Sequence, residues 1–171
     1  MKTVLIIDMS VYFRRAYYNR PTDPMGSLIN AMETLVDVHH TYELIAALDA
    51  GRESWRNQIY PAYKGNRPPP DPAYSAVMPA MRRLLKIALK IPFYERIYFE
   101  ADDVVGSLCA ELPDTYQKII CSPDKDLMQL VNDERHISQL DTGWPMFLIE
   151  RNVEDKIGVP PRAIPDLLAH G

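Results

Sequence analysis

The sequence has few of the residues that define several large classes of protein. Its 171 residues include only two cysteines, Cys109 and Cys121, which are too few and too far apart for a disulfide framework or a zinc site. We therefore expect two buried free thiols and a protein of the reducing cytoplasm. No apolar run is long enough to span a bilayer, so we expect no contact with a membrane.

Glycine is also scarce, and its positions argue against the common phosphate-binding motifs. None of the seven glycines follows the first expected strand, where residues 8–11 are Asp-Met-Ser-Val. A P-loop or a dinucleotide-binding loop needs glycines at that point, because the backbone must approach the phosphates closely. The Gly-x-Ser-x-Gly turn of the serine hydrolases is absent as well. The sequence therefore gives no support to nucleotide binding through a glycine-rich loop or to serine hydrolase chemistry.

Carboxylates, in contrast, stand at the ends of several short apolar runs. We expect strands at residues 3–8, 45–49, 97–99 and 117–121, and acidic residues end or follow each of them. In a parallel α/β sheet the carboxyl ends of the strands share one edge, where ligands bind. Seven carboxylates would meet at that edge: Asp8, Asp49, Glu100, Asp102, Asp103, Asp124 and Asp126.

Such a cluster of like charges needs cations to neutralise it. Hard divalent ions with oxygen ligands, Mg²⁺ or Mn²⁺, do this most simply. The alternative interpretation is that the acids complement helix dipoles, which favour a carboxylate at a helix N-terminus by ~1 kcal/mol or less. That interpretation accounts for one or two acids, but it does not account for Asp102 beside Asp103 behind Glu100.

The remaining pattern alternates strands with helices, which predicts an α/β fold with a central, mainly parallel sheet flanked by helices. Helices are expected at residues 27–41, 76–90, 101–112, 123–131 and 161–169, and two short strands at residues 136–139 and 146–149 with a turn at residues 141–143. Ser122 is the expected N-cap of the helix at 123–131, with Pro123 in its first position. Residues 51–72 are polar and rich in proline, so we expect a long loop there.

Charge is distributed unevenly along the chain. The net charge is −4, but residues 51–96 contain nine basic and only three acidic residues. Cations alternate with tyrosines in this segment, in the order Arg52, Arg56, Tyr60, Tyr63, Lys64 and Arg67. Cations neutralise phosphates, and aromatic rings stack on unpaired bases at about 1–3 kcal/mol for each stack. A solvated helix face and a structural tyrosine cluster remain open as alternatives.

Together these motifs resemble the nuclease domain of the flap endonuclease and 5′→3′ exonuclease family, whose members include the N-terminal domain of bacterial DNA polymerase I and the separate 5′ nucleases of bacteriophages. The resemblance covers essentially the whole chain. It is carried by Asp8 at a strand end, Leu48-Asp49-Ala50, the segment from Trp55-Arg56 to Tyr63-Lys64-Gly65-Asn66-Arg67, Glu100-Ala101-Asp102-Asp103, Ser122-Pro123-Asp124-Lys125-Asp126-Leu127, and Val153–Pro161. It implies a PIN-like, resolvase-like domain with a helical arch inserted within about residues 51–96.

The resemblance also implies a function and roles for individual residues. The domain would cut DNA that has a 5′ single-stranded end or flap by a two-metal mechanism, with the seven carboxylates holding Mg²⁺ or Mn²⁺. Arg56 and Lys64 would be catalytic at the scissile phosphate, and Tyr63 would stack on a base near the cut. The residues expected to bind DNA are Arg52, Tyr63, Arg67, Arg82 and Arg83. The protein would work in the cytoplasm of a bacterial or phage-infected cell.

One feature departs from the family pattern. In the family a Gly-Asp-x-x-Asp motif and a helix-hairpin-helix-type module follow the helix expected at residues 161–169, and residues 1–171 contain neither. We therefore expect the second metal to be held weakly. Two explanations stay open: the chain is a truncated product, or a second polypeptide supplies the missing module. A non-catalytic DNA-binding or assembly subunit of a split nuclease is the alternative function. The complete set of seven acids disfavours it, because a protein that only binds DNA gains nothing from carboxylates beside phosphates.

Overall fold

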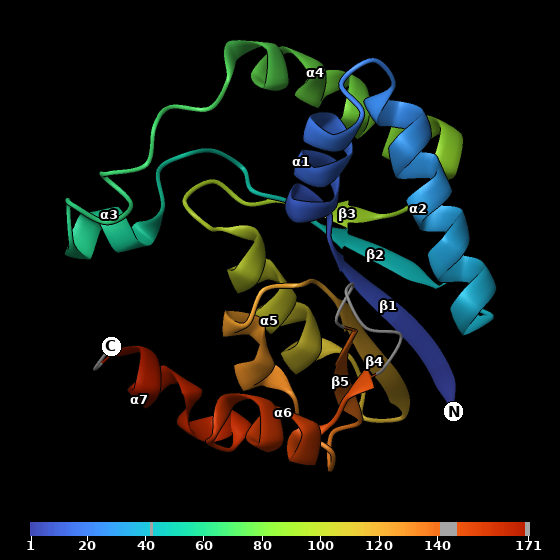
Figure 1. Ribbon diagram of the computed structural model, residues 1–171. Helices are drawn as coiled ribbons and strands as arrows, with labels where there is room; N and C mark the ends of the chain where they lie inside the picture. Colours follow the sequence, from blue (N-terminus) through green and yellow to red (C-terminus); the bar gives the residue numbers. More distant parts are fainter. Residues whose placement is uncertain (42, 141–146, 170–171) are drawn as a thin grey trace.

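The computed structural model describes residues 1–41, 43–140 and 147–169, and its centre is a six-stranded sheet in the order β3-β2-β1-β4-β5-β6 (Figure 1). The strands are β1 (Lys2–Asp8), β2 (Leu44–Ala47), β3 (Phe93–Tyr94), β4 (Tyr116–Cys121), β5 (Ile137–Leu140) and β6 (Phe147–Leu148). β6 pairs antiparallel with β5, while the other pairs are parallel. The predicted α/β fold with a mainly parallel sheet is confirmed.

β1 lies at the centre of the sheet and is buried on both faces. Its side chains alternate between the faces, as in any strand: Leu5 and Ile7 join one apolar cluster, and Ile6 joins the other. Its register places Asp8 opposite Ala47 of β2 and Ile7 opposite Cys121 of β4. The residues that follow these three strands therefore emerge together at one edge of the sheet.

Helices cover both faces of the sheet. One apolar cluster packs α1 (Met9–Asn19), α2 (Pro24–His39), α4 (Pro72–Arg83) and the π-helical turn η1 (Leu84–Leu89) on the first face. The second cluster packs α5 (Ala101–Glu111) and the 3₁₀ turn η2 (Asp126–Leu130) on the other face. The other helical elements are α3 (Trp55–Ile59), α6 (Glu150–Ile157), η3 (Pro161–Ala163) and α7 (Ile164–Ala169). None of the helices in the described ranges is both long and apolar enough to cross a membrane.

The strand predicted at residues 97–99 is wrong. The chain pairs with β2 a few residues earlier, through β3, where the Leu48 N–H donates to the Tyr94 carbonyl at 3.0 Å. It then leaves the sheet through a turn at residues 96–99, so Glu100 reaches the sheet edge from a loop and not from a strand. Short apolar runs of this kind do not by themselves distinguish a strand from a turn.

The helix predicted at residues 123–131 is also wrong in its type and its start. Only η2 is helical there, and Ser122 is not its N-cap, because the Ser122 hydroxyl contacts Asp8 and the Asp124 N–H. The sequence reasoning missed α1, α3 and α6. α1 begins directly after β1 because Asp8 is itself the N-cap, accepting from the Val11 N–H at 3.2 Å.

The other expected elements are present with shifted ends. Asp23 and Asp71 cap α2 and α4, each of which begins with a proline, as is common for the first helical position. The helix expected at residues 161–169 is found as η3 and α7. Cys109 and Cys121 are buried and free, as expected. The turn expected at residues 141–143 lies outside the described residues.

Candidate active site

Asp8 is a buried carboxylate at the end of the central strand. The Ser122 hydroxyl donates to Asp8 Oδ2 at 3.0 Å, and the Val11 N–H donates to Asp8 Oδ1. Burial raises the pKa of Asp8 to about 6, although these two hydrogen bonds lower it, and the charges of Asp49 and Asp124 raise it further. Asp8 is therefore short of positive charge in its surroundings.

Asp49 connects the end of β2 with two helices. Its N–H donates to the Ser10 hydroxyl of α1 at 2.9 Å, and its Oδ1 accepts from the Ala101 N–H of α5 at 2.8 Å. The second contact complements the positive N-terminal end of α5. Asp49 is thereby fixed beside the N-terminus of α5, where Glu100 is the N-cap and the first turn carries Asp102 and Asp103.

Asp102 lies in the first turn of α5, and its pKa is raised further than that of Asp8. Burial raises the pKa of Asp102 to about 7, and the nearby charges of Asp8, Asp124 and Asp49 raise it further, while Lys64 lowers it. Perturbed carboxylates that raise one another's pKa are typical of functional sites. Asp8, Asp49, Asp102 and Asp124 are thus brought into electrostatic contact at the sheet edge, as the sequence predicted.

The turn after β4 contributes the last two acids. The Asp124 N–H donates to the Ser122 hydroxyl at 3.1 Å, and the Asp126 N–H donates to Asp124 Oδ1 at 3.0 Å. Burial raises the pKa of Asp126, as does the neighbouring charge of Asp124. The Ser122 hydroxyl thus joins this turn to Asp8, a role that the sequence did not reveal because a serine before a proline suggested a helix cap.

Glu100 and Asp103 differ from the other acids because the protein supplies cations to both. The Arg56 guanidinium donates to both oxygens of Asp103 at 2.8 and 2.9 Å, and Lys64 Nζ donates to Glu100 Oε2 at 2.6 Å. Burial tends to raise the pKa of Asp103, but the hydrogen bonds and charge of Arg56 hold it below its ordinary value. The Trp55 indole also donates to Asp103 at 3.3 Å, so this carboxylate fastens α3 to α5.

The residues predicted to bind DNA are only partly free to do so. Arg52, Arg67 and Arg83 are exposed, although the Arg52 guanidinium donates to the Arg67 carbonyl at 2.8 Å. The Arg82 guanidinium pairs with Glu95, with a shortest distance of 2.6 Å, and also reaches the Asp49 carbonyl at 3.4 Å. Arg82 therefore joins the end of α4 to the turn after β3 in this structure.

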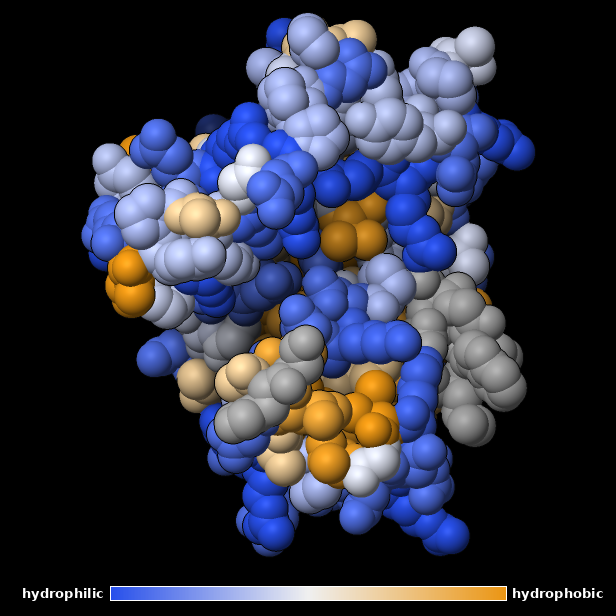
Figure 2. All heavy atoms as spheres, turned by 60° about the vertical axis from the view of Figure 1, so that its left-hand side comes forward, coloured by the Kyte–Doolittle hydropathy of each residue, from blue (hydrophilic) through white to orange (hydrophobic). Residues whose placement is uncertain are grey.

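Figure 2 views the molecule with the side that bears α3 brought forward, and hydrophilic residues predominate in the upper part of this face. Below them a hydrophobic patch lies near the end of α7, where Leu167 and Leu168 are exposed.

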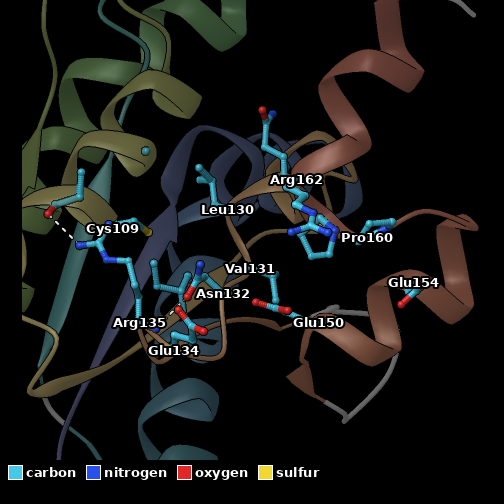
Figure 3. Close-up of a pocket in the computed structure, with 15 residues that line it drawn as sticks. Cys109, Leu130, Val131, Asn132, Glu134, Arg135, Glu150, Glu154, Pro160 and Arg162 are labelled. Atoms are coloured by element: carbon cyan, nitrogen blue, oxygen red, sulfur yellow. Dashed lines mark hydrogen bonds between the residues drawn. The ribbon is translucent and has the colours of Figure 1, made fainter.

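A cavity of about 640 Å³ lies elsewhere, between α5, the residues after η2 and the segment from α6 to η3 (Figure 3). Its lining includes Arg135, which donates to the Ala110 carbonyl at 3.1 Å, but none of the predicted site residues. We assign the candidate site to the acidic edge and not to this cavity.

The acidic edge fits a hard divalent metal in its donor chemistry. Asp8, Asp102 and Asp124 offer carboxylate oxygens in a partly buried setting. The charge of Asp124 raises the pKa of both Asp8 and Asp102, and the charge of Asp8 raises that of Asp102; a cation would relieve that repulsion. Within the described ranges, no three acidic, histidine or cysteine side chains are close enough as they stand to enclose one ion. A bound ion would therefore take one or two of these carboxylates and keep several waters, or would need the carboxylates to move closer together.

Gln139 of β5 is a buried residue of the site that the sequence reasoning missed. Its Nε2 donates to the carbonyls of Ser122 and Asp124 at 2.8 and 2.7 Å. Its Oε1 has no hydrogen-bond partner among the described residues, which is unusual for a buried acceptor. Gln139 thus fastens the turn that carries Asp124, and only the packing of β5 beside β4 reveals it.

We predict that Gln139→Met weakens metal binding by about 10–100-fold, the usual range for residues that orient ligands, because methionine keeps the volume but donates no hydrogen bond. Titration of the metal-free protein with Mn²⁺ measures this. Ser138→Ala is the matched control, since Ser138 is the buried neighbour on the same strand and its hydroxyl has no partner among the described residues. Equal Mn²⁺ affinity of Gln139→Met and wild type would contradict the prediction.

Comparison with known proteins agrees with this geometry. Residues 3–158 match the family described as 5′-3′ exonuclease, N-terminal resolvase-like domain. The 5′-3′ exonuclease of Aquifex aeolicus (strain VF5) is 33% identical over 180 residues, covering 99% of this chain and 61% of that protein. The protein named flap endonuclease Xni of Shewanella sp. (strain ANA-3) is 34% identical over 176 residues, covering 99% of this chain and 66% of that protein. The chain thus spans about three-fifths of the length of such relatives.

A solved structure confirms the fold assignment. The T5 D15 protein co-crystallised with metal ions superposes with a TM-score of 0.72 at 20% identity, covering 92% of this chain and 62% of that one. At this identity the likeness concerns the fold alone, which is the resolvase-like fold that the motifs predicted. The family match, in contrast, extends over nearly all of the sequence, including every predicted acidic position. The chain therefore belongs to the 5′-3′ exonuclease family, and residues 3–158 are its N-terminal resolvase-like domain.

Proposed function

We propose that this domain hydrolyses phosphodiester bonds of DNA as the metal-dependent catalytic part of a 5′ nuclease. The observation that carries the proposal is the meeting of Asp8, Asp102 and Asp124 at one sheet edge, with raised pKa values for Asp8 and Asp102. Lys64 is close enough for its charge to act on Asp102, and Arg56 binds the next residue, Asp103. The names of the relatives support it, since they are 5′-3′ exonucleases and flap endonucleases. One T5 neighbour is described as a complex with DNA and metal ions.

The metal ions would be Mg²⁺ or Mn²⁺. The residues that would hold them are Asp8, Asp49, Glu100, Asp102, Asp124 and Asp126. Asp103 is the seventh predicted ligand, but both of its carboxylate oxygens accept hydrogen bonds from Arg56 in this structure. When bound, such ions lower the pKa of a coordinated water and stabilise the charge on phosphoryl oxygens. Ser122 and Gln139 would keep the Asp8 and Asp124 side of the site in place through the hydrogen bonds described above.

Lys64 and Arg56 would contact the scissile phosphate and stabilise its developing negative charge. In the structure both cations are bound by Glu100 and Asp103, so they must exchange a carboxylate for a phosphate oxygen when DNA arrives. A metal ion on Glu100 would favour that exchange, because it replaces the charge of Lys64. The Tyr63 ring lies next to both cations, 5.1 Å from Lys64 Nζ and 5.9 Å from the Arg56 guanidinium carbon, and would stack on a base near the cut.

The substrate would be DNA with a 5′ single-stranded end or flap. Exposed cations on the segment between β2 and β3, namely Arg52, Arg67 and Arg83, would contact its phosphates. Arg82 would join them only after leaving Glu95. The comparisons give no support to the second polypeptide that the sequence led us to expect.

Cleavage of a 5′-labelled flap oligonucleotide tests the proposal directly. We expect cleavage with Mg²⁺ or Mn²⁺ and none with excess EDTA, because the carboxylates alone cannot approach an anionic phosphate. Oligonucleotides that differ only in the flap, in a recessed 5′ end or in the absence of a free end separate the substrate classes. Binding of the flap without any cleavage, at saturating metal, would favour the non-catalytic DNA-binding subunit instead.

A further inference from the structure

The turn between β3 and α5 carries large apolar side chains into solvent. The Phe99 N–H donates to the Arg96 carbonyl at 2.9 Å and closes a turn over residues 96–99. Its two central residues, Ile97 and Tyr98, are 72% and 48% exposed. This turn tip, defined as Ile97 and Tyr98, thus presents an aliphatic and an aromatic side chain at the surface.

The backbone of the turn tip is unfavourable for the tyrosine that occupies it. Tyr98 has a φ of 69°, in the left-handed region that a turn normally fills with glycine or asparagine at this position. A bulky aromatic residue is uncommon there because its Cβ is crowded. Exposure also denies both side chains most of the stabilisation that burial would give. Neither backbone preference nor packing within the described residues accounts for an isoleucine and a tyrosine here.

The turn tip is held beside the candidate active site. The Trp55 N–H of α3 donates to the Tyr98 carbonyl at 2.8 Å, and Ser54 and Tyr98 form a β-bridge. Figure 1 shows the chain before α5 passing between α3 and the sheet edge. Residue 100, two positions after Tyr98, is the glutamate that Lys64 binds. The turn tip therefore stands between the basic segment and the acidic edge.

We propose that the turn tip is a stacking contact for an unpaired DNA base next to the cleavage site, an inference that rests on the proposed function. A base has apolar faces and an anionic backbone, so it needs a flat apolar contact with cations close by. The turn provides both, because the Arg96 guanidinium lies 5.3 Å from the centre of the Phe99 ring and Arg56 stands on the adjoining helix. A paired base offers no free face to such a tip except at the end of a duplex, so the contact selects DNA that is unpaired at this point.

Tyr98→Asn tests the inference, because a stacking role and a structural role predict opposite outcomes. Asparagine tolerates a positive φ better than tyrosine, so the variant should keep or slightly raise the midpoint of thermal unfolding without DNA. Its affinity for a flap oligonucleotide with 2-aminopurine at the first unpaired position should fall about tenfold, measured by fluorescence with Ca²⁺ in place of Mg²⁺. Tyr98→Phe should retain wild-type affinity, since its ring still stacks. Val38→Asn, at a residue of α2 that is 62% exposed, is the control and should bind as wild type.

Three outcomes would overturn the inference. Equal affinity of Tyr98→Asn and wild type would show that the turn tip does not contact the base. A marked drop in thermal stability would show that Tyr98 is structural. An equal loss of affinity for fully paired DNA would show a general DNA surface or an unspecific effect. If wild type itself binds and cuts no DNA, the proposed function fails; if wild type cuts normally and Tyr98→Asn binds equally well, only the stacking contact is wrong.

Discussion

Asp102→Asn is expected to reduce cleavage by at least about 10²-fold, the scale on which loss of one strong electrostatic contact slows an enzyme. Asp102 lies among Asp8, Asp49 and Asp124, so its carboxylate is central to any metal held at this edge. The neutral amide keeps the size of the side chain but binds a hard cation less well. Single-turnover cleavage of a flap oligonucleotide at saturating Mg²⁺ measures the effect.

The same substitution should stabilise the metal-free protein at neutral and higher pH. The pKa of Asp102 in the folded protein is about 7, above that of an unfolded aspartate, so the folded state binds more protons and its stability falls as pH rises from about 4 to about 7. Asp8, whose folded pKa is about 6, adds to that fall between about pH 4 and 6. Asp102→Asn removes the larger contribution and should raise the free energy of unfolding on the order of 1–3 kcal/mol at pH 8.

Asp155→Asn, at an exposed position of α6, is the matched control and should change neither the cleavage rate nor the pH dependence. Thermal unfolding with EDTA and with Mg²⁺ separates the two effects, because added metal should stabilise wild type more than Asp102→Asn. If Asp102→Asn cuts at the wild-type rate, the acidic edge is not the active site. Without metal, a stability difference between Asp102→Asn and wild type that does not grow as pH rises from 4 to 7 would contradict the repulsion among these carboxylates.

Lys64→Ala is expected to slow the chemical step by about 10²–10³-fold while the affinity for DNA changes much less. The reason is that a single cation near the scissile phosphate matters most when negative charge grows there, whereas many cations share the binding of the strand. Single-turnover rates at saturating enzyme give the chemical step, and fluorescence anisotropy with Ca²⁺ gives the affinity.

Lys86→Ala supplies the control, because Lys86 is exposed on η1 in the same basic segment but contacts no acid of the site in the described structure. The ion pair of Lys64 with Glu100 is about one-third exposed on the lysine side, and pairs of that kind contribute little to stability, so the fold should survive its loss. A normal single-turnover rate with weakened binding would make Lys64 a DNA-binding residue only.

The pairing of Lys64 and Arg56 with two acids has a consequence for the order of binding. Glu100 and Asp103 cannot fully coordinate a metal while Lys64 and Arg56 are bound to them. For the same reason, the two cations cannot bind a phosphate while they are paired with these acids. Metal and DNA should therefore assist each other's binding, since each releases a partner that the other needs. Asp103 is the more firmly held of the two acids, because Arg56, Trp55 and the Glu100 N–H all donate to it.

The sequence by itself determined the fold class, the family and the meeting of acids at one sheet edge. Alternating strand and helix patterns predict a parallel sheet, and in such a sheet the carboxyl ends of the strands share an edge whatever the details of packing. Asp8, Asp49 and Asp124 could therefore be grouped before any coordinates, because each follows an apolar run long enough to be a strand. The basic segment at residues 51–96 could be recognised for the same reason, since charge is visible in composition alone.

Only the tertiary structure decided which charges are satisfied and which are not. The contacts of Arg56 with Asp103 and of Lys64 with Glu100 join residues 47 and 36 positions apart, and local pattern carries no information about such distances. The same holds for Gln139, which reaches the Asp124 turn only because β5 lies beside β4. Residues 97–99 are apolar, which is why the sequence predicts a strand there. In the structure the edge of β2 is paired with residues 93–94 of β3 instead, and residues 97–99 form a turn that leads to α5. Which residues form the strand beside β2 is therefore decided by hydrogen bonds between the strands, and the apolar character of the residues does not decide it.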